Sequence, residues 1–344
     1  MRRAGRLAGI VSILVVACPL KVAAAETPFY KELVKKAQAE GQVEYWTSMD
    51  EGSANKILKE FSRKFGIKSK AKLWRGPAIH QRTLIEIQSG RKVSADVMDP
   101  GRESRQQFLE AGVFEKPPFD YYKVWPDIPK VLNDPSGWAL NVNGSSRAIA
   151  YNSRTVPPEL VPKSWDDCTR PEFKGKVTLD ARHKLYPLHW HRREWFLDWV
   201  KRMVANGVKV FRGQTEMLQF VVGGAYVMLC GAQPYTVQDL IDQGAKELKI
   251  AVPGELLVEI ADADFIRKGS PHPHAGQLLV GWLATEGQPY LDKEELRGFP
   301  WVKGTFNAKL AEGHKVLLCD PECTLKADEM SREYVRALGL PVTK

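Results

Sequence analysis

Three arginines stand in turns that connect a predicted strand to a predicted helix: Arg75, Arg182 and Arg212. The backbone N–H groups and the dipole of the following helix favour an anion at such a turn. A guanidinium group adds two parallel hydrogen bonds to a carboxylate, phosphonate or phosphate. Similar turns hold three hydroxyl side chains, those of Thr47, Ser48 and Thr215. We expect these residues to bind the oxygens of an anionic ligand, and the alternative for each arginine is an ordinary solvated loop.

Five further side chains would shape such a site. Asp99 and Asp180 follow predicted strands, and each carboxylate would either pair with an arginine or bind an amine of a zwitterionic ligand. Gln233 and Tyr235 follow another strand and would set selectivity. Trp74 directly precedes the first arginine and would form a wall of the site, although a buried strand residue is the simpler interpretation.

Signatures of catalysis are absent from the sequence, which contains no G-x-S-x-G motif, no P-loop and no G-x-G-x-x-G motif. Ser145 and Ser146 form a turn with no evident partner histidine. His183, His189 and His191 stand at the start of a predicted helix, where residues two apart point to different faces. We therefore expect exposed or partner-facing histidines rather than metal ligands, and neither an enzyme nor a cofactor.

Strand and helix signals alternate along the chain, a rhythm typical of a parallel sheet covered by helices. A stretch rich in Pro, Tyr and Trp at residues 116–135 interrupts this rhythm, and two short strands follow within 138–151. We predict further strands at residues 42–47, 67–74, 94–98, 176–180, 226–230 and 248–252, and helices at 51–65, around 84–87, and at 190–206, 214–222 and 237–243. Two α/β units predict two lobes, with a ligand crevice at the carboxyl ends of the strands.

The N-terminus has the features of a secretory signal. Three arginines, at positions 2, 3 and 6, precede the apolar run Leu7–Leu20, which is too short to span a bilayer. Ala23-Ala24-Ala25 then matches a signal peptidase site, so residues 1–25 are interpreted as a signal peptide and the mature protein as periplasmic. The alternative is a lipoprotein, because the sequence from Val15 to Cys18 resembles a lipoprotein box whose cysteine is acylated.

The composition is that of a globular protein of about two domains, with 344 residues, 44% of them hydrophobic and 26% charged. The formal charge of +9 falls to about +5 without the signal segment, and basic residues alternate with acidic ones. This pattern argues against a nucleic-acid surface. Four cysteines remain, of which Cys319 and Cys323 favour a local disulfide over free thiols or a zinc pair. Cys168 and Cys230 are expected to be unpaired, buried and apolar in character.

Several stretches together resemble the periplasmic solute-binding proteins of ABC importers, in the group that includes ferric-iron, polyamine, thiamine, phosphonate and sugar-phosphate binders. The stretches are Val43–Ser48, Ser94–Val97, Ala148–Ser153, Ser164–Asp167, Phe173–Val177, Phe265–Ala275 and Glu286–Gln288. The resemblance implies a type II fold of two α/β lobes joined by crossover strands, with the ligand held between them and delivered to a membrane permease. It places lobe 1 at residues 26–145 and 258–310 and lobe 2 at 146–257, with the helices of 311–344 assigned to lobe 2, in a monomer.

The ferric-iron members of this group carry an adjacent tyrosine pair after the strand that matches residues 226–230. Here that stretch reads Cys230-Gly231-Ala232-Gln233-Pro234-Tyr235, so the pair is absent. The resemblance therefore favours a small polar or anionic organic solute. The alternative is a ferric-iron site, for which Tyr235, His80 and Asp99 would be the ligands.

Overall fold

The computed structural model describes residues 27–341 except residue 261. The interpretation of residues 1–25 as a signal peptide and the alternative role of Cys18 lie outside the described residues. Within them, no helix combines the length and the apolar character needed to cross a membrane.

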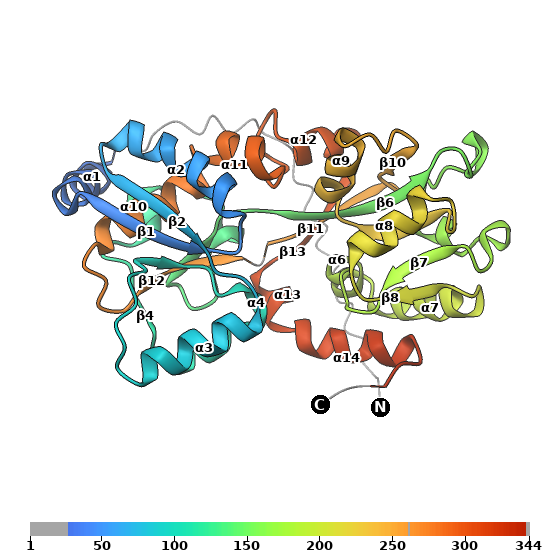
Figure 1. Cartoon of the computed structure of the whole chain (residues 1–344), viewed down its shortest axis with the longest axis horizontal. Helices are drawn as coiled ribbons and strands as arrows, with labels where there is room; N and C mark the ends of the chain where they lie inside the picture. The colour runs from blue at the N-terminus through green and yellow to red at the C-terminus, as the bar shows by residue number, and fades with distance from the viewer. Residues whose placement is uncertain (1–26, 261, 342–344) are drawn as a thin grey trace, which may run out of the picture.

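Two β-sheets form the centres of two lobes that lie side by side (Figure 1). The sheet of lobe 1 has the order β2-β1-β3-β12-β4, with β5 paired to β12. Its strands are β1 (Gln42–Thr47), β2 (Lys68–Leu73), β3 (Val97–Met98), β4 (Phe114–Glu115), β5 (Ala139–Asn141) and β12 (Ala263–Arg267). The sheet of lobe 2 has the order β13-β11-β6-β9-β7-β8, with β10 paired to β6. Its strands are β6 (Ser145–Asn152), β7 (Val177–Asp180), β8 (Lys209–Phe211), β9 (Met228–Ala232), β10 (Leu248–Ala251), β11 (Glu255–Glu259) and β13 (Lys315–Cys319).

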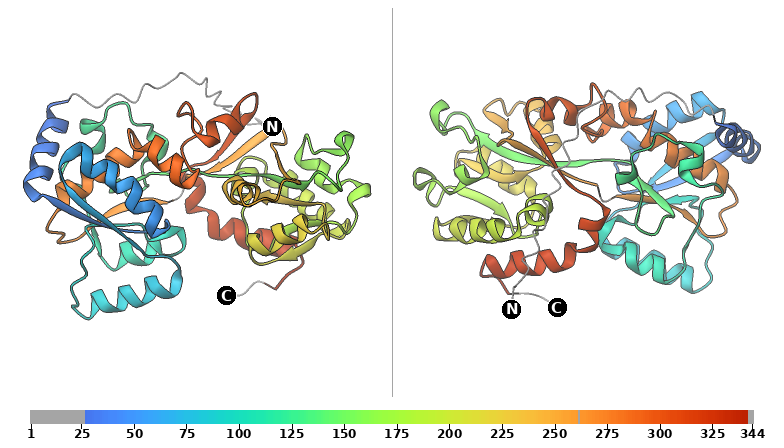
Figure 2. Two further views of the ribbon diagram at one scale, coloured as in Figure 1. Left: turned by 45° about the horizontal axis from the view of Figure 1, so that its top comes forward. Right: turned by 180° about the vertical axis from the view of Figure 1, so that it is seen from behind.

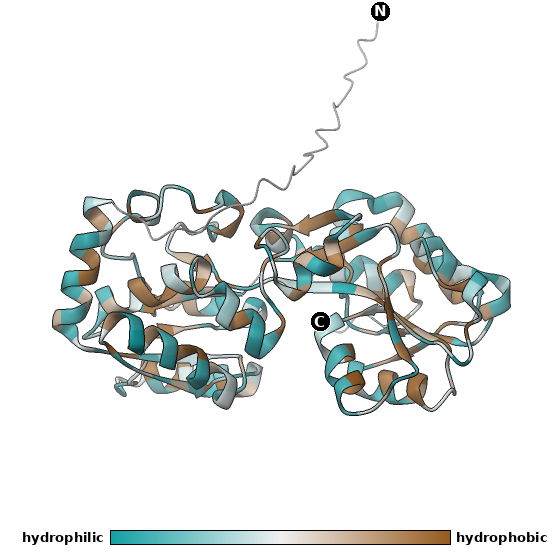
Figure 3. Ribbon diagram, turned by 90° about the horizontal axis from the view of Figure 1, so that it is seen from above, coloured by the Kyte–Doolittle hydropathy of each residue, from teal (hydrophilic) through white to brown (hydrophobic). Residues whose placement is uncertain are grey.

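Helices cover both faces of each sheet, so each lobe has three layers. The helices of lobe 1 are α1 (Pro28–Glu40), α2 (Glu51–Phe65), α3 (Pro77–Gln88), α4 (Gly101–Glu110), α5 (Tyr121–Val124), α10 (Pro273–Ala284), α11 (Gln288–Glu295) and α12 (Phe306–Ala311). Those of lobe 2 are α6 (Tyr186–His191), α7 (Arg193–Ala205), α8 (Gln214–Val222), α9 (Pro234–Asp242), α13 (Pro321–Leu325) and α14 (Ala327–Ala337). Apolar residues concentrate on the strands and on one side of the helices (Figure 3).

Helix α2 shows how local sequence produces these elements. The Asp50 carboxylate accepts hydrogen bonds from the N–H groups of Gly52 and Ser53 and so caps the first turn. Gly66 ends the helix in the left-handed conformation, at φ 71°. Between these ends the buried residues recur at helical spacing, and Phe61 is fully buried against the lobe 1 sheet. The predicted helix at 51–65 is therefore confirmed.

The chain passes between the lobes three times, through the connections β5–β6, β11–β12 and α12–β13 (Figures 1 and 2). Strand β11 belongs to both cores, because Leu256 and Val258 pack in the core of lobe 1 whereas Leu257 packs in that of lobe 2. After β13 the chain continues into α14, whose Tyr334 is buried in the core of lobe 2. These crossings form the floor between the lobes.

Two disulfides lie in lobe 2. Cys319 and Cys323 are bonded, which confirms the prediction for this pair. Cys168 and Cys230 are also bonded, so the expectation of unpaired cysteines was wrong. They are 62 residues apart in the sequence, and only the packing of the 3-10 turn Trp165–Thr169 beside β9 brings them together.

Candidate ligand-binding site between the lobes

The carboxyl ends of β1 and β3 meet at the edge of lobe 1 that borders lobe 2. Ser48 donates hydrogen bonds to Asp99 from its N–H (3.2 Å) and its hydroxyl (2.6 Å), and Gly101 N–H donates to the other oxygen of Asp99 at 3.0 Å. Asp99 therefore stabilises the turn and forms no pair with an arginine among the described residues. Thr47 is fully buried and accepts from Met49 N–H, so its hydroxyl is not presented to the cleft.

The predicted wall at Trp74 lies inside the lobe. Trp74 is 1% exposed, its indole N–H donates to the Thr83 hydroxyl at 2.9 Å, and its ring packs on Trp46. This is the buried strand-end role that the sequence also allowed, and Trp74 does not line the cleft. The next residue, Arg75, is exposed and donates from Nε to the Ser48 carbonyl at 2.5 Å.

In lobe 2 the turn after β7 holds an ion pair. Arg182 donates from Nε and Nη2 to the two oxygens of Asp180, at 3.1 and 2.8 Å, which is one of the two roles expected for this carboxylate. Arg212 and Thr215, in the turn between β8 and α8, are both exposed. The fold thus places these residues at one edge of lobe 2, but it leaves Arg212 and Thr215 on the surface.

Arg147 is the residue that the sequence analysis missed. It lies on β6, is 4% exposed, and donates from Nη1 to the Ser145 hydroxyl (2.8 Å) and the Ser146 carbonyl (2.9 Å). Its Nε has no hydrogen-bond partner, and no carboxylate among the described side chains lies within ion-pair distance. The available signal was the single charged residue of the strand Ser145–Asn152, directly before the apolar run Ala148–Ala150.

A small cavity of about 20 Å³ borders Arg147, which is space for roughly one water molecule. Lys184, Gln214 and Gln233 also line it. The side-chain N–H₂ group of Gln214 is buried without a partner, while its oxygen accepts from Gln233 N–H at 2.6 Å. Lys184 has no carboxylate in ion-pair contact within the part of the chain that the structure describes. Burial lowers the pKa of Lys184, and the Arg147 cation lowers it further.

Two arginines of lobe 1 reach tyrosines of lobe 2. Arg102 forms an ion pair with Glu259 and lies 4.2 Å from the ring centre of Tyr186. Arg297 donates to the Tyr235 hydroxyl at 2.9 Å, and its guanidinium carbon lies 4.6 Å from that ring centre. These contacts join the two lobes.

Charged groups of both signs meet between the lobes, where Asp262 interacts with Asp99 and Glu259 as well as with Arg297 and Arg102. Burial alone would raise the pKa of Glu259, but the cations of Arg102, Arg147 and Lys184 hold it below its usual value. Since Glu259 pairs with Arg102, the charges of Arg147 and Lys184 have no ion-pair partner of their own among the described residues. Such an arrangement is suited to an anion that enters between the lobes.

The three residues of the ferric alternative are engaged separately. His80 is buried with its Nδ1 2.8 Å from the Ser104 hydroxyl, Asp99 accepts from Ser48, and Tyr235 accepts from Arg297. Within residues 27–341, no group of three or more His, Cys, Asp or Glu side chains is arranged to hold a metal ion. A guanidinium at the Tyr235 hydroxyl also opposes a metal cation there.

Of the three histidines in this segment, His191 on α6 is exposed, as expected, whereas the other two are buried, contrary to expectation. His183 and His189 are 2% and 1% exposed, with their rings linked at 3.0 Å, and His189 Nε2 lies 2.9 Å from Glu333 of α14. The aromatic rings of α7 and α14 enclose this pair, which the helical spacing alone did not indicate.

A second cavity, of about 800 Å³, lies at the opposite end of the lobe 1 strands. Gln42, the first residue of β1, lines it, whereas Thr47 at the other end of β1 lies roughly 16 Å away along the strand. Lys68, Lys70 and Lys92 also line this cavity, so it too carries cations.

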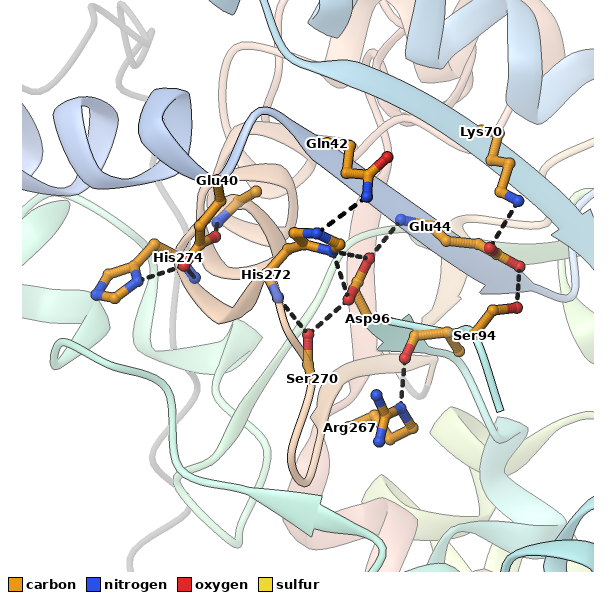
Figure 4. Close-up of polar contacts among 12 residues, drawn as sticks. Glu40, Gln42, Glu44, Lys70, Ser94, Asp96, Arg267, Ser270, His272 and His274 are labelled. Atoms are coloured by element: carbon orange, nitrogen blue, oxygen red, sulfur yellow. Dashed lines mark hydrogen bonds and ion pairs between the residues drawn. The ribbon is translucent and has the colours of Figure 1, made fainter. Parts of the chain in front are cut away.

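The carboxylates of this second cavity are all bound by neighbouring groups (Figure 4). Asp96 accepts from Glu44 N–H (2.8 Å) and the Ser270 hydroxyl (2.6 Å), and His272 Nδ1 lies 3.1 Å from it. Lys70 pairs with Glu44 at 2.8 Å. The network ties β1, β3 and the turn after β12 together, and we assign it a structural role.

Solved structures with the same architecture are solute-binding proteins. Ferric binding protein from Bordetella superposes with a TM-score of 0.68 at 18% identity, covering 87% of this chain and 99% of that chain. Trichodesmium IdiA (FutA), in complex with iron and citrate, gives 0.67 at 18% identity, covering 86% and 99%. Iron-bound HitA from Pseudomonas aeruginosa gives 0.64 at 18% identity, covering 87% and 99%. At this identity the likeness establishes the fold.

The two-lobed α/β fold of this chain is the fold of these binding proteins. Residues 94–322 match the family of bacterial extracellular solute-binding proteins, so the chain belongs to that family. The protein is accordingly a solute-binding protein rather than an enzyme.

Proposed function

We propose that the protein captures a small organic anion between its lobes in the periplasm and delivers it to the permease of an ABC importer. Hinge closure around the ligand presents the closed form to the permease. The protein acts as a monomer without a cofactor. Export depends on the N-terminal signal, with cleavage after Ala25, and acylation of Cys18 is the alternative route.

One observation carries this proposal: the buried guanidinium of Arg147 has an unpartnered Nε and no ion-pair partner among the described residues. Leaving a buried charge uncompensated costs on the order of several kcal/mol. A carboxylate or phosphonate would supply the missing charge and the missing hydrogen-bond acceptor. Lys184 and the unpartnered amide of Gln214 border the same cavity and would donate to the same group.

The supporting residues differ in their expected contributions. Arg182 would contribute charge after its pair with Asp180 rearranges, and Gln233 would contact the ligand beside Ser145. Arg75 and Arg212, both exposed, would attract the anion to the cleft rather than hold it.

A thermal-shift screen on refolded, ligand-free protein tests the proposal. The panel holds succinate, citrate, methylphosphonate, glycerol phosphate, amino acids, spermidine and ferric citrate. A ligand at 100 times its Kd stabilises the folded state by about 2.7 kcal/mol. We expect a raised midpoint with organic anions and none with spermidine. A shift with ferric ion but with no iron-free anion would overturn the proposal in favour of the ferric alternative.

A further inference from the structure

We infer that proton uptake by the buried pair His183 and His189 releases helix α14 from lobe 2 in mildly acidic solution. Helix α14 lies beside α6 and α7 on the lower side of that lobe in Figure 1. It fastens the segment 180–189, from which Arg182 and Lys184 reach the cavity at Arg147. The release requires no bound ligand, so it goes beyond the proposed function and does not depend on it.

Three side chains of α14 form hydrogen bonds with this segment. The pairs are Tyr334 with the Asp180 carbonyl (2.5 Å), Ser331 with the Tyr186 hydroxyl (2.9 Å) and Glu333 with His189 Nε2 (2.9 Å). The helix buries Ala327, Met330 and Tyr334 against the lobe. Because these contacts are made by side chains, α14 can separate from the lobe without breaking a strand pair, as a local opening.

The hydrogen bonds of the two imidazoles leave no site for an additional proton. Leu185 N–H donates to His183 Nδ1 at 3.4 Å, so the proton of this ring lies on Nε2. His183 Nε2 donates in turn to His189 Nδ1 at 3.0 Å, and His189 Nε2 donates to Glu333. Each imidazole is therefore neutral, with one nitrogen as donor and the other as acceptor. A further proton on either ring would place two donors face to face and break a hydrogen bond.

The surroundings of His183 disfavour a positive charge. Aromatic rings from α6, α7 and α14 enclose it, those of Tyr186, Phe196 and Tyr334. Burial lowers the pKa of His183 well below its ordinary value of 6.5, and the neighbouring His189, Arg102 and Lys184 lower it further. This imidazole is consequently held neutral for as long as the lobe stays closed around it.

His189 has charged neighbours of both signs. Burial is the largest effect and lowers the pKa of His189, and Arg193 of α7 lowers it further. Glu333 and Glu329 of α14 act in the opposite direction, but the pKa stays below 6.5. Separation of α14 removes the cover from both rings, so water reaches them and their ordinary pKa returns. The released state then binds more protons than the docked state, and it is favoured as the pH falls below 6.5.

Hydrogen exchange of the mature protein at pH 7.5 and 5.5, followed by mass spectrometry, tests this release. The rates are corrected for the pH dependence of intrinsic exchange, and the protection of residues 327–337 is compared with that of α2 in lobe 1. At one pH unit below 6.5, each histidine that is neutral only while α14 is docked weakens the docking by up to about tenfold. We expect the protection of α14 to fall by about ten- to hundredfold from pH 7.5 to 5.5, and that of α2 to change by less than about twofold.

Matched variants identify the groups that take up the protons. The double variant His183→Asn, His189→Gln removes both titrations and keeps an amide near the ring nitrogens. Its α14 should have the same protection at both pH values. His314→Gln removes an exposed histidine of the turn before β13 and should keep the full pH dependence of wild type.

Three results would overturn the inference. They are equal protection of α14 at both pH values in wild type, an equal loss of protection in α2, and a double variant with the pH dependence of wild type. If the double variant does not fold, nitrogen-15 NMR of the wild-type imidazoles decides. His183 and His189 should take up protons only as α14 loses protection, and protonation of both rings with α14 still protected would contradict the inference.

Discussion

The ionisation of Asp262 makes the free energy of unfolding of the protein depend on pH. It follows the crossover from β11, and burial raises its pKa from the ordinary 3.8 to about 6. The negative charges of Asp99 and Glu259 contribute to this increase, whereas Arg297 and Arg102 oppose it. The folded protein therefore resists ionisation of this carboxyl more strongly than the unfolded chain does.

The size of the effect follows from linkage between protonation and folding. The pKa of Asp262 in the folded protein lies about two units above its value in the unfolded chain, which corresponds to about 3 kcal/mol. At a pH where the carboxyl is ionised in both states, the free energy of unfolding is lower by this amount. Well below pH 3.8 the group is protonated in both states and the penalty vanishes. As the pH rises from 4 to 6, this carboxyl therefore reduces the free energy of unfolding. Asp262→Asn removes the titration, so we expect the variant to be more stable than wild type by roughly 1–3 kcal/mol above pH 6.5 and by only about 0.5 kcal/mol at pH 4.

Urea unfolding followed by circular dichroism at several pH values between 4 and 8 measures this difference. Comparison with wild type cancels the other titrating groups, and exposed Asp127→Asn is the control for removal of a carboxylate without burial. A stability difference that does not change between pH 4 and 7, or one that favours wild type at pH 7, would refute the reasoning.

Two other predictions concern regions away from the cleft. Replacing Cys168 and Cys230 by alanine should lower the free energy of unfolding by about 4 kcal/mol, and replacing Cys319 and Cys323 should lower it by about 2 kcal/mol. The first loss is larger because that disulfide closes a far longer loop and so restricts the unfolded chain more. Equal losses in chemical denaturation would contradict this prediction. Asp96→Asn should lower the free energy of unfolding by about 1–3 kcal/mol through its buried hydrogen bonds. It should leave anion affinity unchanged, and a loss of affinity in calorimetry would show that the second cavity is not purely structural.

Local patterns in the sequence were sufficient for much of the architecture. The predicted helices at 51–65 and 214–222 and the strand at 42–47 agree with α2, α8 and β1, because periodic apolar residues and end signals act within one element. The predicted helix at 190–206 is divided, since α6 ends at His191 and α7 begins at Arg193. The return of β12 to the sheet of lobe 1 depends on pairing with β3 across more than 160 residues, which no local pattern encodes.

The candidate site was predicted less well, for a related reason. Turns after strands correctly drew attention to the ion pair of Asp180 and Arg182. Arg147 was missed because it stands out only by the absence of a counter-ion among the described residues, and tertiary packing alone determines which groups surround it. Trp74 shows the reverse error, since its position beside a cleft turn suggested contact with ligand although its ring fills the core of lobe 1.

The account rests on an organic anion bound at Arg147, and calorimetric titration of matched variants tests it most directly. Citrate, succinate and methylphosphonate would be titrated into wild type, Arg147→Met, Arg147→Lys and Lys201→Met, the last removing an exposed lysine of α7. We predict saturable binding of at least one anion, weakened by about 1.5–3 kcal/mol in Arg147→Met, partly restored in Arg147→Lys and unchanged in Lys201→Met. Equal affinity of wild type and Arg147→Met, or binding of none of the three anions, would contradict it.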